Sequence, residues 1–473
     1  MNITTILLIL NVLNAMGYTL LSPLFPILGK SNGLSDALIG WVISAYAISN
    51  TIMAPFIPLL VQKFTRAKVL YFSTFSVATC TILYSFLYYI SSFYSLLIIA
   101  FIIRIIHGGS SGIVFTLIYS LTISLSDKEK VQKSLGYLEL GLCFGASCGP
   151  LIASIFYKIG GYPLPFLVLG LFLYLSVYFS NKIGRENINS KENENDKKED
   201  LPFFKFFRNN EILIILGCFL ITMISDTFFL PCLTNYLIQK YKFSVSIASL
   251  FFIIPTIFYV IVLQLLDFIS SKIGLYGTSC LGLLLTSIGS FLLAPLISIL
   301  NNIFIFVIGF GLIGAGEAPI FIPLLIVLSK CIIKFEKNID ELTANDIASS
   351  LNNIFIAIGE FSGPIIGGFI TTYFGFNYCC FFISIFIFIY FLMFIFYFYN
   401  EIFYDFNNKE SVEKYNDIED KKTTKYFSKS FSYYGKIFLL NNNEESKISR
   451  NAISSLEMSK KMKRISLFSS LMK

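Results

Sequence analysis

Long apolar runs separated by short polar segments fill most of this chain. A helix needs about 20 apolar residues to cross the hydrocarbon core of a bilayer, and it satisfies its own backbone hydrogen bonds there. The pattern therefore predicts twelve membrane-spanning helices, at residues 4–28, 37–61, 69–90, 96–121, 135–156, 164–179, 212–237, 247–268, 275–300, 303–328, 347–373 and 378–398.

Two longer polar segments divide the chain. Residues 181–210, rich in Lys, Glu and Asn, separate six apolar runs from six others. Residues 404–473 contain no sustained apolar run, so we expect a mostly disordered tail. The predicted organisation is a six-helix bundle over residues 1–180, a central loop over 181–210, a second six-helix bundle over 211–403 and the tail over 404–473.

The basic residues predict the orientation of the chain in the membrane. With the N-terminus inside, the inner loops carry 17 Lys and Arg, whereas the outer loops carry 4. Because such residues concentrate in cytoplasmic loops, we expect both termini, the central loop and the tail to be cytoplasmic. The net charge of +7 then reflects orientation, and no nucleic-acid partner is expected. The pattern leaves open whether the membrane is the plasma membrane or that of a vesicle or vacuole.

Composition supports a membrane protein. Hydrophobic residues make up 55% of the chain and charged residues 14%, whereas soluble domains carry about 25% charged residues. Soluble, collagenous and disulfide-scaffold classes are excluded. The first apolar run lacks a basic segment before it and a small-residue cleavage site, so we interpret it as a span and not as a secretory signal.

Metal, cofactor and enzyme chemistry find little support in the sequence. The chain has nine Cys and one His, with no CxxC motif, and most Cys lie in apolar runs where they serve as small packing residues. A zinc site needs several convergent soft ligands. No P-loop, HExxH or catalytic triad motif is present. We therefore expect no metal, no cofactor and no enzymatic activity.

A motif recurs at matched positions in the two halves. The fifth and eleventh runs both contain G-x-x-x-G-P, 214 residues apart. The residues are Gly145, Gly149 and Pro150 in the first copy and Gly359, Gly363 and Pro364 in the second. Proline within a helix removes a backbone hydrogen bond, and glycine allows close helix approach. Six-span repeats with a site between them are a transporter architecture, so we expect these residues to shape gating helices.

These motifs resemble the major facilitator superfamily. Gly136, with Gly145, Gly149 and Pro150, fits the antiporter signature G-x8-G-x3-G-P, and Arg104 begins the R-x-x-x-G of the fourth span. The resemblance covers about residues 4–399. It implies an all-α membrane protein with twelve transmembrane helices in two pseudo-symmetric six-helix halves, the major facilitator fold, and a transporter similar to drug:H⁺ antiporters.

Within this superfamily, segments 134–139 and 165–170 look like the vesicular amine and polyamine transporter branch. The loop after the second span departs from the family pattern, because Gln62 stands where an Asp is usual. The matching position after the eighth span is Ser271. This departure affects the familiar charge latch of the loop and leaves the fold unaffected.

Charged residues inside the predicted spans carry the functional hypothesis. Glu139, Asp226, Glu317 and Glu360 lie in the fifth, seventh, tenth and eleventh runs, and Arg104 is the evident countercharge. A charge at the bilayer centre costs about 2.5–3.5 kcal/mol, so such residues are functional by default. The surplus acids must bind protons or pair with a cation. Both answers describe a proton-coupled cation carrier.

Other side chains of these spans are candidates for supporting roles. Arg104 and His107 share one helical face, and we expect Arg104 to pair with an acid, Glu139 first. His107, the one histidine, is either a proton relay or a packing residue. Tyr18 and Tyr46 are candidates for aromatic contact with an organic cation.

The resemblance also carries residues over from the vesicular amine transporters. Their tenth-span acid matches Glu317, whereas their first- and eleventh-span acids fall on Asn14 and Asn353. Their seventh-span acid falls one turn from Asp226. Glu139, by the 214-residue offset, is the repeat mate of Asn353. The acids are therefore redistributed among the spans, which weakens the case for the same monoamine substrates and proton stoichiometry.

Three functional hypotheses follow. The first is a proton-coupled antiporter of an organic cation (an amine, a polyamine or a drug-like compound), expected to be monomeric in the lipid bilayer. The alternative is a facilitator or symporter of a neutral or anionic metabolite, with Arg104 as an anion anchor. A second alternative is a transport-dead membrane sensor or tether whose output runs through the tail.

Overall fold

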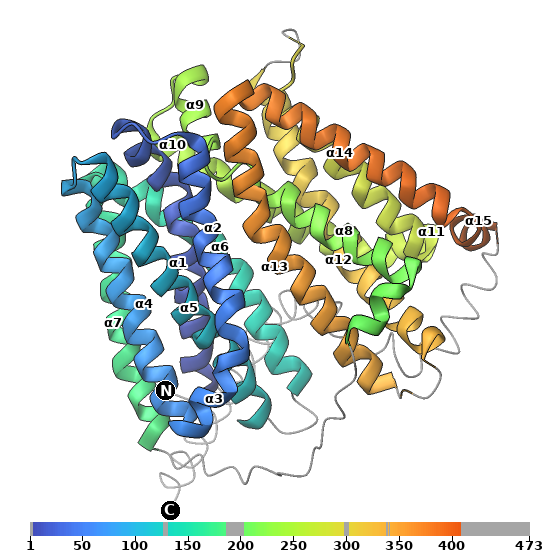
Figure 1. Cartoon of the computed structure of the whole chain (residues 1–473), viewed down its shortest axis with the longest axis horizontal. Coiled ribbons are helices and arrows are strands. Elements are labelled where there is room, and N and C mark those ends of the chain that lie inside the picture. Colours follow the sequence, from blue (N-terminus) through green and yellow to red (C-terminus); the bar gives the residue numbers. More distant parts are fainter. Residues whose placement is uncertain are drawn as a thin grey trace, which may run out of the picture. The chain divides into compact units, whose positions relative to one another are not determined.

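A computed structural model describes residues 3–125, 131–185, 203–297, 302–336, 339 and 341–407 (Figure 1). The described part of the first half consists of helices. They are α1 (Ile3–Ser31), α2 (Asp36–Met53), η1 (Ala54–Phe56), α3 (Ile57–Lys63), α4 (Arg66–Phe86), η2 (Leu87–Tyr89), α5 (Phe93–Leu125), α6 (Val131–Gly160) and α7 (Pro163–Arg185).

The described part of the second half is also built of helices. They are η3 (Phe203–Arg208), α8 (Asn210–Thr227), α9 (Leu233–Tyr241), α10 (Val245–Leu250), η4 (Phe251–Ile253), α11 (Ile254–Leu293), α12 (Ile303–Phe335), α13 (Glu341–Phe374), α14 (Phe376–Tyr397) and α15 (Tyr399–Asn407). The predicted central loop thus contains the end of α7 and η3, and the predicted tail contains the end of α15. The rest of both segments lies outside the described residues.

The helices accommodate the twelve predicted spans. Within the described residues, ten helical stretches are long and apolar enough to cross a membrane, and Pro163–Tyr178 is a shorter apolar helix. The longest stretch, Val245–Leu293, contains 49 residues and holds two crossings, because Gly274 interrupts the helical backbone with φ 73° and ψ 175°. This left-handed backbone favours glycine. The turn lies where the sequence predicts the loop between the eighth and ninth spans.

The seventh span is broken, and its prediction as one continuous helix over residues 212–237 is wrong. Helix α8 ends at Thr227 and α9 begins at Leu233. Pro231 has no N–H to donate, and the intervening backbone forms short turn bonds from Leu230 N to the Thr227 carbonyl and from Cys232 N to the Phe229 carbonyl. The break follows Asp226, which therefore lies at the C-terminal end of α8.

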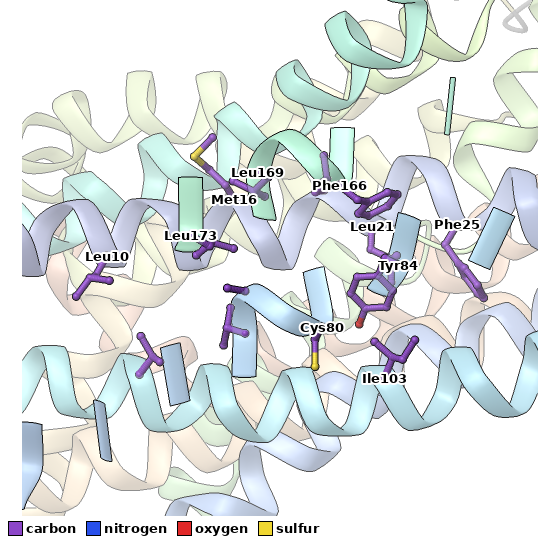
Figure 2. Packing of buried hydrophobic residues seen from close by; sticks show 14 of the residues in the cluster. Leu10, Met16, Leu21, Phe25, Cys80, Tyr84, Ile103, Phe166, Leu169 and Leu173 are labelled. Atoms are coloured by element: carbon purple, nitrogen blue, oxygen red, sulfur yellow. The ribbon is translucent and has the colours of Figure 1, made fainter. Parts of the chain in front are cut away.

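Each half has its own hydrophobic core. One cluster of buried side chains comes from residues 6–177, whereas two others come from residues 206–398. Figure 2 shows the first cluster, where side chains from four helices meet, including Leu21 of α1, Tyr84 of α4, Ile103 of α5 and Phe166 of α7. The rings of Tyr84 and Phe166 lie 5.7 Å apart between centroids. Separate cores let each half keep its packing when the other moves.

The repeated glycines hold equivalent helix pairs together. In the first half, Gly145 of α6 lies so close to α1 that a side chain would clash with the Val12 carbonyl oxygen. In the second half, a Cβ on Gly359 of α13 would lie 2.6 Å from the Leu220 carbonyl oxygen of α8. Helices α6 and α13 remain helical through their prolines. The glycines thus provide close packing, and gating by these helices stays a prediction.

Candidate functional site

The first half buries a guanidinium among aromatic rings. Arg104 of α5 has no exposed surface. Its guanidinium carbon lies 4.6 Å from the ring centroid of Tyr46 on α2 and 5.7 Å from that of Tyr18 on α1. Its Nε donates to the Ile43 carbonyl oxygen at 3.4 Å, while its two terminal nitrogens have no hydrogen-bond partner among the described residues. The charge is therefore stabilised chiefly by π faces.

His107 lies one turn further along α5 and is fully buried. Its ring packs edge-on against Tyr46 and Tyr84, with centroids 5.3 and 5.6 Å away. The Tyr84 hydroxyl lies 3.3 Å from Nδ1, and Nε2 has no partner among the described residues. These buried, aromatic surroundings fit the interpretation of His107 as a packing residue. Its Nε2 atom remains able to bind a proton.

A second polar group continues the cluster toward α1. The Ser111 hydroxyl donates to Asn14 Oδ1 at 2.8 Å and also contacts the Tyr46 hydroxyl. Asn14 is 5% exposed. The amide oxygen of Asn14 is therefore already hydrogen-bonded within the first half. A charged acid at this position would have to accept this hydrogen bond in its place.

Three acids of the second half lie in half-buried positions on three helices. They are Asp226 at the end of α8, Glu317 on α12 and Glu360 on α13. The Asp226 and Glu317 carboxyls face each other and interact electrostatically. Of the Glu317 oxygens, Oε1 is buried without a partner among the described residues. Two carboxyls this close cannot both stay ionised in a low-dielectric site, so the pair must hold a proton or a cation.

Glu317 lies in an unbroken helix. Its flanking glycines pack closely against α11. A side chain on Gly314 would clash with the Pro255 carbonyl oxygen, and one on Gly316 would lie 2.7 Å from the Gly282 carbonyl oxygen. Close packing, and not unwinding, explains these small residues.

The two halves meet at Glu360. The Tyr18 hydroxyl faces its carboxyl, and the two groups interact electrostatically. On the next residue, the Phe361 carbonyl oxygen accepts a 2.6 Å hydrogen bond from Ser44 of α2. In Figure 1, α13 runs beside α2 along this contact. Arg104, Tyr18, Glu360, Asp226 and Glu317 thus form a continuous polar series from the first half to the second.

Other predicted site residues lie apart from this series or cannot be assigned to it. Asn353 on α13 is exposed, and Gly136 and Glu139 fall on α6 with their side chains outside the described residues. The pairing of Arg104 with Glu139 therefore stays a prediction. Ser271 donates to the Phe268 carbonyl oxygen of its own helix at 2.8 Å.

Sequence reasoning missed the partners that organise the cluster. Ser44, Tyr84 and Ser111 are ordinary residues of apolar spans, and no motif marks them. Among the described residues, no group of three or more His, Cys, Asp or Glu side chains is arranged to hold a metal ion.

The family model of the Major Facilitator Superfamily matches residues 7–334 and, in an overlapping match, residues 215–444. The chain belongs to this superfamily. Because the superfamily and the relatives below are transporters, the chain is a multi-pass membrane transporter of small molecules and not an enzyme.

Relatives and solved structures agree with this assignment. The chain is 24% identical over 380 residues to the mouse MFS-type transporter SLC18B1, covering 77% of this chain and 78% of the relative. It is 24% identical over 384 residues to multidrug resistance protein 1 of Bacillus subtilis, covering 78% and 89%.

Two solved structures share the fold. A bacterial homolog of the human lysosomal transporter Spinster, inward-facing and occupied, matches with a TM-score of 0.66 and 12% identity, covering 83% of this chain and 95% of that one. The nucleoside transporter NupG matches with a TM-score of 0.65 and 14% identity, covering 84% and 98%. These matches support the twelve-helix fold with its two six-helix halves.

Proposed function

We propose that the chain is a proton-coupled antiporter of an organic cation, such as an amine, a polyamine or a drug-like compound. The single observation that carries the proposal is the facing pair of carboxyls at Asp226 and Glu317, in the second half and next to the broken seventh span. Among the described residues no basic side chain is hydrogen-bonded to either carboxyl, so the pair binds either protons or a positively charged ligand. Exchange of one for the other at the same site is antiport.

The charge balance of the series supports a cation and not an anion. Asp226, Glu317 and Glu360 all lie in the second half, while Arg104 lies in the first half against two tyrosine rings. Bare carboxylates in a low-dielectric site are costly, so a transported cation gains a favourable interaction there. The relatives named as a multidrug resistance protein and a quinolone resistance protein, the latter from Staphylococcus aureus, agree with a substrate of this kind.

The orientation is part of the proposal. The excess of basic residues in alternate loops supports cytoplasmic termini. With this orientation, the hydrogen bonds Ala37–Thr372 and Ser44–Phe361 lie toward the outer face of the membrane. An epitope tag at each end, probed with antibody before and after permeabilisation, tests this, since staining of intact cells would reverse the assignment.

Transport itself is tested in proteoliposomes with an imposed pH gradient and a lumenal pH dye. Amines and polyamines are added singly, and proton efflux is recorded. We expect efflux that depends on a cation and is lost in Glu317→Gln. Glu211→Gln is the matched control, because that acid pairs with Lys334 at the helix surface. Folded protein that shows no efflux with any cation would refute the proposal.

One observation favours a second candidate function. The terminal nitrogens of Arg104 are buried and have no hydrogen-bond partner among the described residues, so they suit the carboxylate or phosphate of an anionic metabolite. Uptake of a labelled anion, lost in Arg104→Gln and indifferent to Glu317→Gln, would establish this function in place of cation exchange.

A further inference from the structure

Glu360 differs from the other two acids in its surroundings. Asp226 and Glu317 belong to the second half, and their carboxyls face each other. The titratable and charged groups that face Glu360 come mainly from the first half and are Tyr18 of α1, Tyr46 of α2 and Arg104 of α5, with Asp226 of α8 from the second half.

Tyr18 connects Glu360 to the buried guanidinium. Its ring centroid lies 4.8 Å from that of Tyr46 and 5.7 Å from the guanidinium carbon of Arg104. Its hydroxyl faces the Glu360 carboxyl. One side chain thus contacts the fixed positive charge of the first half with its ring and an acid of the second half with its hydroxyl.

The backbone around Glu360 is fixed to α2. Ser44 donates its 2.6 Å hydrogen bond to the carbonyl of Phe361, the next residue. One turn later, Pro364 packs against Gly40 of α2. A side chain at position 40 would clash with the Pro364 carbonyl oxygen. Any change in the attraction between Glu360 and the first half therefore acts directly at the α2–α13 contact.

We propose that Glu360 is the acid that couples protonation to separation of the two halves, with Tyr18 as its positioning residue, whereas Asp226 and Glu317 hold the transported cation. This inference rests on the proposed function and assigns separate roles within its site.

The physical basis is the charge of Glu360. A carboxylate accepts a stronger hydrogen bond from a phenol than a neutral carboxyl does, and only the carboxylate is attracted to Arg104. The ionised form therefore holds α13 on α2, and the protonated form releases it. We therefore expect the contact between α2 and α13 to open as the pH falls.

The test measures the distance between the two halves directly. Spin labels are placed on Ser31→Cys at the end of α1 and on Tyr373→Cys near the end of α13, both exposed, and distances are measured by pulsed electron resonance at a series of pH values. The native cysteines are buried or half-buried, and the chain without the two added cysteines reports any background label. We expect a short distance at high pH and a growing long-distance population at low pH.

Variants assign this shift to named side chains. Glu360→Gln should give the long distance at every pH. Tyr18→Phe should raise the ratio of long to short distance at high pH by about tenfold, as loss of a charge-assisted hydrogen bond implies. Tyr174→Phe is the matched control, because its hydroxyl contacts Thr79 within the first half, away from Glu360. It should leave the ratio unchanged.

The outcomes separate this inference from the proposed function. A Glu360→Gln chain that keeps the pH-dependent shift, or a Tyr18→Phe chain that behaves like Tyr174→Phe, would overturn the inference while cation-driven proton efflux remained. Loss of that efflux in the parent chain would instead refute the proposed function. If Glu360→Gln does not fold, the comparison of Tyr18→Phe with Tyr174→Phe decides.

Discussion

The Ser44 hydroxyl of α2 donates a 2.6 Å hydrogen bond to the Phe361 carbonyl oxygen of α13, and so joins the two halves one residue from a membrane-embedded acid. The contact is between a hydroxyl and a backbone carbonyl, so its own strength does not depend on the charge of its neighbours. The adjacent carboxyl, Glu360, adds the part of the attraction that changes with protonation.

The acid pair of the second half should behave as one unit. We expect Asp226→Asn and Glu317→Gln each to lower cation-driven proton efflux at least about tenfold, and the double variant to be no worse than the poorer single one, because the effects of substituting two residues that interact directly are not additive. Efflux rates in proteoliposomes measure this. Losses that multiply in the double variant would show that the two acids act independently.

Charge alone should not replace Arg104. Arg104→Lys keeps the positive charge but loses the planar group that lies over Tyr46, 4.6 Å from its centroid. We expect a loss of about 1–2 kcal/mol of stability and at least about tenfold in transport, measured by thermal unfolding and by efflux. The control is Arg208→Lys at an exposed position. Equal behaviour of the two variants would contradict the role of stacking.

The glycines at which α13 packs closely against α8 should not tolerate even one added carbon. At Gly367 of α13, a side chain would clash with the Phe228 carbonyl oxygen, which belongs to backbone and cannot rotate away. We expect Gly367→Ala to cost about 1–3 kcal/mol in thermal unfolding. Gly17→Ala is the control, because its Cβ would lie at an ordinary 3.5 Å from His107 Nε2. A Gly367→Ala chain as stable as Gly17→Ala would mean that the two helices are less tightly packed.

The fold was largely predictable from the sequence because lipid imposes one strong rule on every span. Runs of apolar residues had to be helices of fixed length, and all twelve predicted spans have helical counterparts among the described residues. The break after Thr227 was missed because a proline is tolerated in membrane helices, so Pro231 alone does not distinguish a bend from an interruption.

The candidate site was only partly predictable. Intramembrane charge identified Asp226, Glu317, Glu360 and Arg104, since such residues are costly in lipid. Their partners depend on helix rotation and contact between distant segments, which the sequence does not encode in a motif. Tyr18 was a candidate for contact with an organic cation through its π face. That its hydroxyl faces Glu360, 342 positions away, followed from the fold alone.

The contact between α2 and α13 should have to open during transport. The backbone N–H of Ala37 donates to Thr372 Oγ1 at 2.9 Å, so cysteines at these two positions lie close enough to be joined by a mild, membrane-permeant oxidant. We expect oxidation of Ala37→Cys/Thr372→Cys to stop cation-driven efflux, and a reductant to restore it, because a covalent bond between the halves holds this end closed. The control pair is Ser287→Cys/Ser384→Cys, which joins two helices of the same half whose serines exchange hydrogen bonds of 3.1 and 2.9 Å. Oxidation of that pair should leave efflux in place, since each half moves with its core intact. Undiminished transport with the α2–α13 pair shown to be joined would mean that this end stays closed throughout the cycle.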